Sequence, residues 1–162
     1  MNWVQIGKGQ MNSAAVMRGV LGRREGKWAK TVGYYAAFVA LGAGAASLGP
    51  TLHGLAENTH STLSQISYLF MARALGYLFG SVLAGRVYDR MAGHPLMVGA
   101  LCIMIVTLLM TPLLSVLAVL IAVLLVMGMA EGLLDVGGKT LLVWVHQPDI
   151  GPYMNALHFS LG

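Results

Sequence analysis

The chain has 162 residues, of which 57% are hydrophobic and only 10% are charged. An ordinary soluble domain carries about 25% charged residues, so this composition excludes a soluble globular fold. Ten Lys and Arg against six Asp and Glu give a formal net charge of +4, but the basic residues are scattered and form no nucleic-acid-binding surface. On so apolar a chain they indicate the cytoplasmic flanks of membrane helices. The single Cys102 supports neither a disulfide framework nor a cysteine metal site.

Residues 1–30 differ in composition from the rest of the chain, because six Lys and Arg lie there among Gly, Ser, Asn and Gln. We predict that this segment is a mobile, basic cytoplasmic tail. A cleaved signal peptide is the alternative interpretation of the tail and the first apolar segment. Three further long apolar segments favour a membrane protein with several spans instead.

Four apolar segments are long enough to cross the ~30 Å hydrocarbon layer, which requires roughly 20 helical residues. We predict these helices at about residues 31–52, 65–87, 96–113 and 116–145. A fifth apolar segment begins at about residue 153 and stops after roughly ten residues, too few to cross a bilayer as a helix. The predicted fold class is an all-α polytopic membrane protein, and the chain is interpreted as an N-terminal fragment.

The distribution of basic residues predicts the orientation, because Lys and Arg in short loops stay on the cytoplasmic side. Residues 1–30 and the loop at 86–90 are basic, whereas residues 53–64 and 111–115 contain no Lys or Arg. All these segments agree on an integral protein of the plasma or inner membrane with a cytoplasmic N-terminus.

Three ionisable residues share one face of the fourth predicted helix, since Glu131, Asp135 and Lys139 are spaced i, i+4, i+8. Each costs about 2.5–3.5 kcal/mol at membrane depth and usually faces a protein interior or a watery cavity. The structural alternative is an Asp135–Lys139 pair that only neutralises itself. One lysine cannot neutralise both acids, so we expect at least one carboxylate to serve a coupling cation, a proton or a polar solute.

Two more ionisable residues lie in apolar segments. Arg73 is interpreted as a structural charge that snorkels outward or reaches an acid on a neighbouring helix. Because Glu131 is expected to lie deeper by on the order of 10 Å, their direct pairing would require helix tilt or offset. His158 is the one histidine that we expect to line a polar cavity. The sequence contains no cofactor or metal motif.

Small residues indicate where helices approach each other and where one ends. Gly76, Gly80 and Ala84 are four residues apart, a spacing that permits close contact between membrane helices. The dipeptide Gly49-Pro50 near the outer end of the first predicted helix indicates a break in that helix.

The segment 80–95 resembles the signature loop between the second and third helices of major facilitator superfamily transporters. It departs from the pattern by the extra residue Ala92 and by His94, where a pair of basic residues is usual. The resemblance implies a cytoplasmic gating loop built from Gly85, Asp89, Arg90 and Gly93.

Further stretches are similar to one branch of this superfamily, the sodium-dependent glucose transporter-like proteins near the fucose permeases. They are residues 47–51, 64–81, 132–139 and 155–160. In fucose permeases an acid on the fourth helix takes part in cation coupling, and Asp135 is the matching position, with Lys139 replacing a more usual Asn. The resemblance therefore implies a solute or ion site that includes Asp135 and Glu131, with Na⁺ or H⁺ as the coupling ion.

The same resemblance implies twelve helices in two halves, of which residues 31–162 form the incomplete N-terminal half. The implied function is secondary transport of a small polar solute, most simply a sugar, by alternating access and without enzymatic activity. The implied partners are the lipid bilayer, the solute and the missing C-terminal half. The alternatives are a non-transporting four-helix membrane scaffold and a degenerate transporter remnant. An intramembrane enzyme using His158 and Asp135 has nothing else in the sequence to support it.

Overall fold

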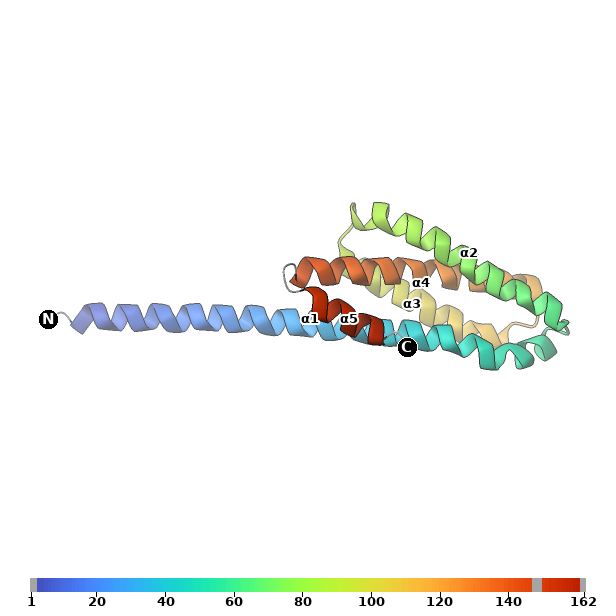
Figure 1. The fold of residues 1–162 in the computed structure, drawn as a ribbon, viewed down its shortest axis with the longest axis horizontal. Helices are drawn as coiled ribbons and strands as arrows, with labels where there is room; N and C mark the ends of the chain where they lie inside the picture. The colour runs from blue at the N-terminus through green and yellow to red at the C-terminus, as the bar shows by residue number, and fades with distance from the viewer. Residues whose placement is uncertain (1–2, 147–149, 161–162) are drawn as a thin grey trace. The chain divides into compact units, whose positions relative to one another are not determined.

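The computed structural model describes residues 3–146 and 150–160, and the side-chain surroundings of residues 28–62, 64–146 and 150–159. The described residues are mainly helical and contain no strand, which confirms the predicted all-α class. The elements in chain order are α1 (Trp3–Asn58), α2 (Leu63–Tyr88), α3 (Gly93–Met110), the short 3₁₀ helix η1 (Thr111–Leu113), α4 (Leu117–His146) and α5 (Ile150–Ser160) (Figure 1).

The chain divides into two compact units, Met1–Tyr34 and Tyr35–Gly162. In the first unit the backbone is helical from Trp3 onward, a feature that the polar composition of residues 1–30 did not predict. The mobility and cytoplasmic location of this tail stay predictions. The second unit holds residues 35–58 of α1, the remaining helices and every residue of the candidate site.

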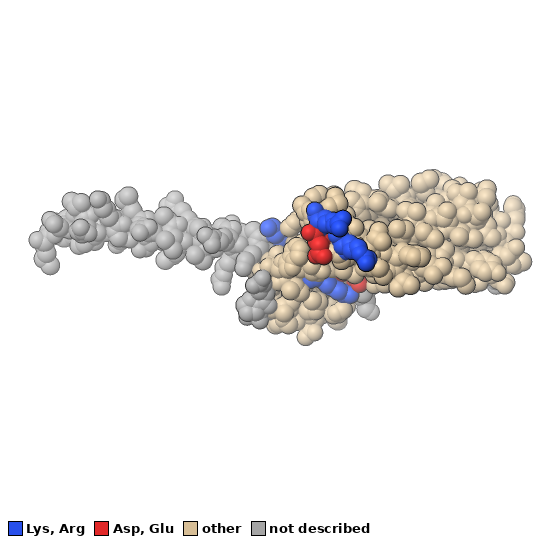
Figure 2. All heavy atoms as spheres, turned by 90° about the horizontal axis from the view of Figure 1, so that it is seen from above, with Lys and Arg blue, Asp and Glu red and all other residues tan. Residues whose placement is uncertain are grey.

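Four helical segments are long and apolar enough to cross a membrane: Trp28–Asn58, Ser64–Tyr88, Gly93–Leu113 and Leu117–His146. They coincide with the four predicted segments and extend them by up to about two turns. Many large apolar side chains on them remain exposed, among them Phe79 and Leu109, as expected for helices that face lipid. On the face drawn in Figure 2 the charged side chains of the described residues gather in one region, and a large area of tan surface beside it carries none.

Helix α1 continues through Pro50, so the break predicted at this position is absent. Proline removes one backbone donor, which inside a helix leaves a carbonyl without its usual partner. Neighbouring hydroxyls saturate other carbonyls of the same stretch: Ser47 Oγ donates to the Gly44 carbonyl and Thr51 Oγ1 to the Ser47 carbonyl, both at 2.8 Å. Hydroxyl groups commonly satisfy the backbone around proline in membrane helices.

Helix α2 begins at Leu63 because Thr62 caps it. The Gln65 amide donates to Thr62 Oγ1 at 3.3 Å, and the Thr62 amide donates to Gln65 Oε1 at 2.9 Å. This reciprocal capping box satisfies two backbone donors that the first turn would leave unpaired. It places the start of the helix two residues before the predicted position.

The connection between α3 and α4 is fastened to the end of α1. Helix α3 gives way to η1 at Thr111, so the last three residues of the third predicted helix are 3₁₀ rather than α-helical. The Asn58 side-chain amide donates to the carbonyls of Pro112 and Leu114, each at 3.2 Å. One side chain thus replaces the hydrogen bonds that these loop carbonyls lack.

Helices α2 and α4 lie side by side (Figure 1), and four glycines bring their backbones close together. A Cβ added at Gly76 or Gly80 would collide with the carbonyl of Leu125 or Met129, and one added at Gly128 or Gly132 with the carbonyl of Arg73 or Tyr77. The close approach predicted from the glycine spacing is therefore confirmed, and glycines of the fourth helix contribute equally. This crossing brings the polar residues of the two helices within reach.

Apolar side chains of α1 to α4 form a core beside this crossing. They include the fully or almost fully buried Ile66, Leu69, Leu120 and Leu124, with Met104 and Met127 packed against them. A methionine side chain adapts its shape to fill irregular space. The core fixes the two helices on which the charged residues lie.

Candidate functional site

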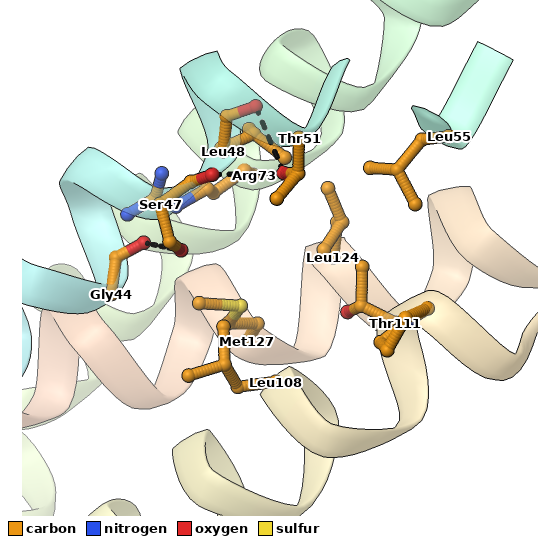
Figure 3. Close-up of a pocket in the computed structure, with 11 residues that line it drawn as sticks. Gly44, Ser47, Leu48, Thr51, Leu55, Arg73, Leu108, Thr111, Leu124 and Met127 are labelled. Atoms are coloured by element: carbon orange, nitrogen blue, oxygen red, sulfur yellow. Dashed lines mark hydrogen bonds between the residues drawn. The ribbon is translucent and has the colours of Figure 1, made fainter. Parts of the chain in front are cut away.

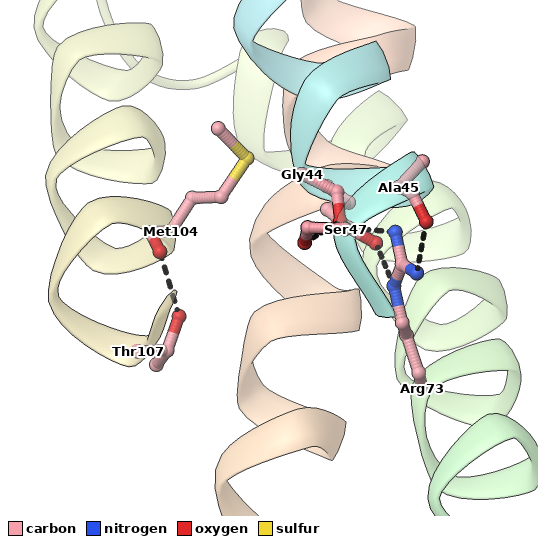
Figure 4. Close-up of polar contacts among 7 residues, drawn as sticks. Gly44, Ala45, Ser47, Arg73, Met104 and Thr107 are labelled. Atoms are coloured by element: carbon pink, nitrogen blue, oxygen red, sulfur yellow. Dashed lines mark hydrogen bonds and ion pairs between the residues drawn. The ribbon is translucent and has the colours of Figure 1, made fainter. Parts of the chain in front are cut away.

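A two-pronged ion pair joins α2 to α4. Arg73 Nε donates to Glu131 Oε2 at 2.8 Å, and Arg73 Nη2 donates to Glu131 Oε1 at 2.7 Å. The side chains are only 14% and 5% exposed. A third bond runs from Arg73 Nη1 to the Ala45 carbonyl on α1, at 3.3 Å (Figure 4). One guanidinium therefore holds three helices together, as its planar fork of donors allows.

A second polar cluster lies one turn further along the same two helices. The Tyr77 hydroxyl donates to Asp135 Oδ2 at 2.8 Å. Lys139 Nζ lies 2.8 Å from both Oδ1 and Oδ2 of Asp135. Asp135 is buried, whereas the Lys139 side chain is 33% exposed. The carboxylate thus has one partner across the helix crossing and one on its own helix.

The two clusters form successive rungs between parallel helices. Arg73 and Tyr77 are four residues apart on α2, Glu131 and Asp135 are four apart on α4, and each rung joins residues 58 positions apart. A constant offset is what two helices running in the same direction produce. The glycine contacts between the rungs set the separation at which both rungs close.

Arg73 supplies a second cation for the two acids of α4, so the expectation of one cation for two carboxylates is wrong. From the sequence alone, at least one carboxylate is expected to lack a cationic partner, but Glu131 pairs with Arg73 and Asp135 with Lys139. The depth difference expected between Arg73 and Glu131 does not prevent their pairing: Gly128 lies against the Arg73 carbonyl and Gly132 against the Tyr77 carbonyl, so Glu131 is within about one turn of Arg73. The Asp135–Lys139 pair, considered as the structural alternative, is present. The roles predicted for these residues in binding solute or ion stay predictions.

Two cavities meet at Arg73. The first, about 390 Å³, is lined by the polar side chains of Arg73, Tyr77 and Glu131 and by apolar groups, namely Leu41, Ala45, Phe70 and Ala74. The second, about 260 Å³, lies between α1, α2, α3 and α4 (Figure 3). Its hydroxyls, on Ser47, Thr51 and Thr111, donate at 2.8 Å to backbone carbonyls three or four residues earlier in the chain. The first cavity therefore offers polar groups to a ligand, and the second is mainly apolar. We call the first the Arg73–Tyr77 cavity.

His158, predicted to line a polar cavity, is exposed on α5 and lines neither of these two cavities. The structure does not bring it to the ion pairs. Within the described ranges, no group of three His, Cys, Asp or Glu residues could hold a metal ion. An ion at this site would have to bind a carboxylate that already has partners.

The predicted gating loop lies at the end of α2 and the start of α3. The Asp89 amide donates to the Gly85 carbonyl at 3.2 Å, and Asp89 and Arg90 are both exposed. In the part of the chain that the structure describes, neither side chain makes an ion pair. Gly93 packs on Leu141, because a Cβ there would lie 2.5 Å from Leu141 Cδ2. The gating role stays a prediction.

Sequence reasoning missed Tyr77 and the Ala45 carbonyl. A tyrosine in an apolar helix carries no signal by itself, and a backbone carbonyl carries none at all. The spacing of Arg73 and Tyr77 nevertheless repeats that of Glu131 and Asp135, and this match between two parallel helices could have indicated the two rungs.

Known proteins resemble this chain in sequence. The Major Facilitator Superfamily profile matches residues 34–158. The rat protein named sodium-dependent glucose transporter 1 is 39% identical over 135 residues, which are 83% of this chain and 28% of the relative. The human protein of that name is 36% identical over 125 residues, or 77% of this chain and 24% of the relative. Human major facilitator superfamily domain-containing protein 4A is 35% identical over 135 residues, or 82% and 26%.

The chain thus spans about a quarter of the length of the curated relatives it matches. No solved structure matches it. The family match covers more than half of the chain, and the four apolar spans make this an integral membrane protein. The resemblance noted in the sequence is confirmed: the chain belongs to the major facilitator superfamily, a family of transporters and not of enzymes.

Proposed function

We propose that this chain is part of a secondary transporter that moves a small, polar, sugar-like solute by alternating access. The observation that carries the proposal is the pair of ionic rungs within apolar spans, beside the Arg73–Tyr77 cavity. Ionisable groups at this depth are costly and usually mark a solute or ion pathway. The names of the relatives specify glucose as a solute, which supports a sugar.

Coupling to Na⁺ or H⁺ would act at Asp135. An ion or proton that binds this carboxylate must displace Lys139, whose partly exposed ammonium group can move toward water. The same event weakens the bond from Tyr77, because a neutralised carboxylate is a poorer acceptor. Tyr77 also lines the Arg73–Tyr77 cavity. Ion binding at Asp135 would therefore change the hydrogen bonding of a side chain at the proposed solute site. Glu131 is the second candidate, more tightly held by Arg73.

The rest of the proposed machinery lies outside these helices. A partner half of the carrier would close the solute site from the other side, and the exposed Asp89 and Arg90 would form the cytoplasmic latch between halves. This arrangement requires a cytoplasmic N-terminus. The scaffold alternative would use the glycine faces of α2 and α4 for oligomer contacts, whereas these glycines already contact the opposite helix within the chain.

The test is the variant Asp135→Asn in the complete carrier, reconstituted into liposomes. We expect loss of solute accumulation under a Na⁺ or H⁺ gradient, with retained exchange of labelled for unlabelled solute, because only coupling is removed. Glu57→Gln is the matched control, since Glu57 is 73% exposed and, among the described residues, its side chain pairs only with His53 at a helix end. Accumulation by Asp135→Asn at the level of this control would remove Asp135 from coupling.

A further inference from the structure

We propose that Arg73 binds the solute directly and that its pairing with Glu131 makes the site select neutral, polyhydroxylated solutes over charged analogues. This inference rests on the proposed transport function and assigns the solute class. It also gives Arg73 a specificity-determining role in addition to its structural one.

The Arg73 guanidinium has N–H donors that form no hydrogen bond with the described residues. Arginine carries five N–H groups, and the described residues use three of them: one on Nε and one on Nη2 for Glu131, and one on Nη1 for the Ala45 carbonyl. One N–H on Nη1 and one on Nη2 have no partner among the described residues. Arg73 lines the Arg73–Tyr77 cavity, so these donors are placed to meet a ligand oxygen.

Acceptors lie beside these donors. Each carboxylate oxygen of Glu131 accepts one bond from Arg73, and an ionised carboxylate has about four lone-pair sites. A hydroxyl group both donates and accepts, so one solute hydroxyl can bond Arg73 while its neighbour bonds Glu131. Phe70 and Leu41 give the same cavity an apolar wall for the carbon skeleton. An apolar wall with a few convergent polar groups is the usual composition of a small-molecule site.

The charges cancel within the site. Arg73 offsets Glu131 and Lys139 offsets Asp135, and three of these four side chains are at most 14% exposed. An anionic solute would compete with Glu131 for Arg73, and a cationic solute would compete with Arg73 for Glu131. Either one leaves a charge without a partner in a poorly solvated place, which is strongly unfavourable. A neutral polyol breaks neither pair.

The experiment measures competition for exchange of labelled glucose by the complete carrier in liposomes. The probes share one skeleton: neutral glucose, anionic glucuronate, cationic glucosamine, and deoxyglucoses that each lack one hydroxyl. In the unmodified carrier we expect glucuronate and glucosamine to compete at least about tenfold more weakly than glucose. We also expect at least one deoxyglucose to be weaker by about tenfold, the effect of losing a hydrogen bond to a charged group.

The variant Arg73→Lys keeps a cation for Glu131 but loses the planar pair of nitrogens. We expect it to bind glucose about tenfold more weakly and to lose its preference for glucose over the deoxyglucose that the unmodified carrier rejects. Arg86→Lys, an exposed arginine near the end of α2, is the matched control and should keep both values. A merely structural Arg73 would weaken all deoxyglucoses equally and leave the preference in place.

The outcomes separate this inference from the transport proposal. An Arg73→Lys carrier with unchanged affinity and unchanged preference overturns the inference alone, as does equal competition by glucose, glucuronate and glucosamine. If Arg73→Lys does not fold, the deoxyglucose series on the unmodified carrier tests the inference. Equal binding of every analogue would mean that no solute hydroxyl forms a hydrogen bond with the site, and would overturn it. An unmodified carrier that exchanges none of the probes overturns the sugar-transport proposal as well.

Discussion

Gly132 sets how closely α4 approaches α2, and Gly132→Ala should force the two helices apart. A Cβ at this position would lie 2.7 Å from the Ser81 amide nitrogen and 2.9 Å from Ser81 Oγ, and would collide with the Tyr77 carbonyl. Ordinary van der Waals contact begins at 3.4 Å, so the helices must separate by at least about 0.7 Å, the difference from 2.7 Å.

This separation also affects the polar rungs. A shift of about 0.7 Å would stretch the 2.8 Å bond from Tyr77 to Asp135 to roughly 3.5 Å, beyond the useful range of a hydrogen bond. Overpacking costs about 1–3 kcal/mol. The better helix propensity of alanine returns at most about 1 kcal/mol, which the weakened hydrogen bond offsets. We therefore expect a net loss of about 1–3 kcal/mol in the free energy of unfolding.

The measurement is thermal unfolding of the purified protein in detergent, monitored by intrinsic fluorescence. Gly99→Ala on α3 is the matched control, because a Cβ there meets nothing within 4 Å and alanine should leave the melting temperature unchanged or raise it. If Gly132→Ala melts at the temperature of Gly99→Ala, the helices are not in backbone contact at this glycine and the reasoning fails.

Two further predictions concern the rungs and the helix cap. Glu131→Gln should lower the free energy of unfolding by about 3–5 kcal/mol, because it leaves the 14% exposed Arg73 without its partner. Asp135→Asn should cost less, because Lys139 is 33% exposed and can reach water. Equal melting temperatures of the two variants would contradict this ranking. Thr62→Ala removes the capping box and should cost about 1 kcal/mol, seen as faster hydrogen exchange at the start of α2, whereas Thr62→Ser should restore protection.

The hydropathy of the chain alone determines the number and approximate bounds of the membrane spans. Whether a segment can cross the lipid depends on its own length and hydropathy, and a helix forms its backbone hydrogen bonds within itself, without distant residues. The same holds for the start of α2, where Thr62 and Gln65 are three residues apart. The glycine spacing on α2 likewise predicted a close helix contact, though not its partner.

Only the tertiary structure decides which charges meet. Arg73 and Glu131 are 58 residues apart, and their contact depends on the rotation of α2 and α4 and on the glycine contacts that set the helix separation. Sequence spacing reports faces of one helix but not how two helices are rotated toward each other. For this reason Asp135, Glu131 and Lys139 could be named from the sequence, whereas the pairing of Arg73, the bond from Tyr77 and the cavity beside them depend on packing.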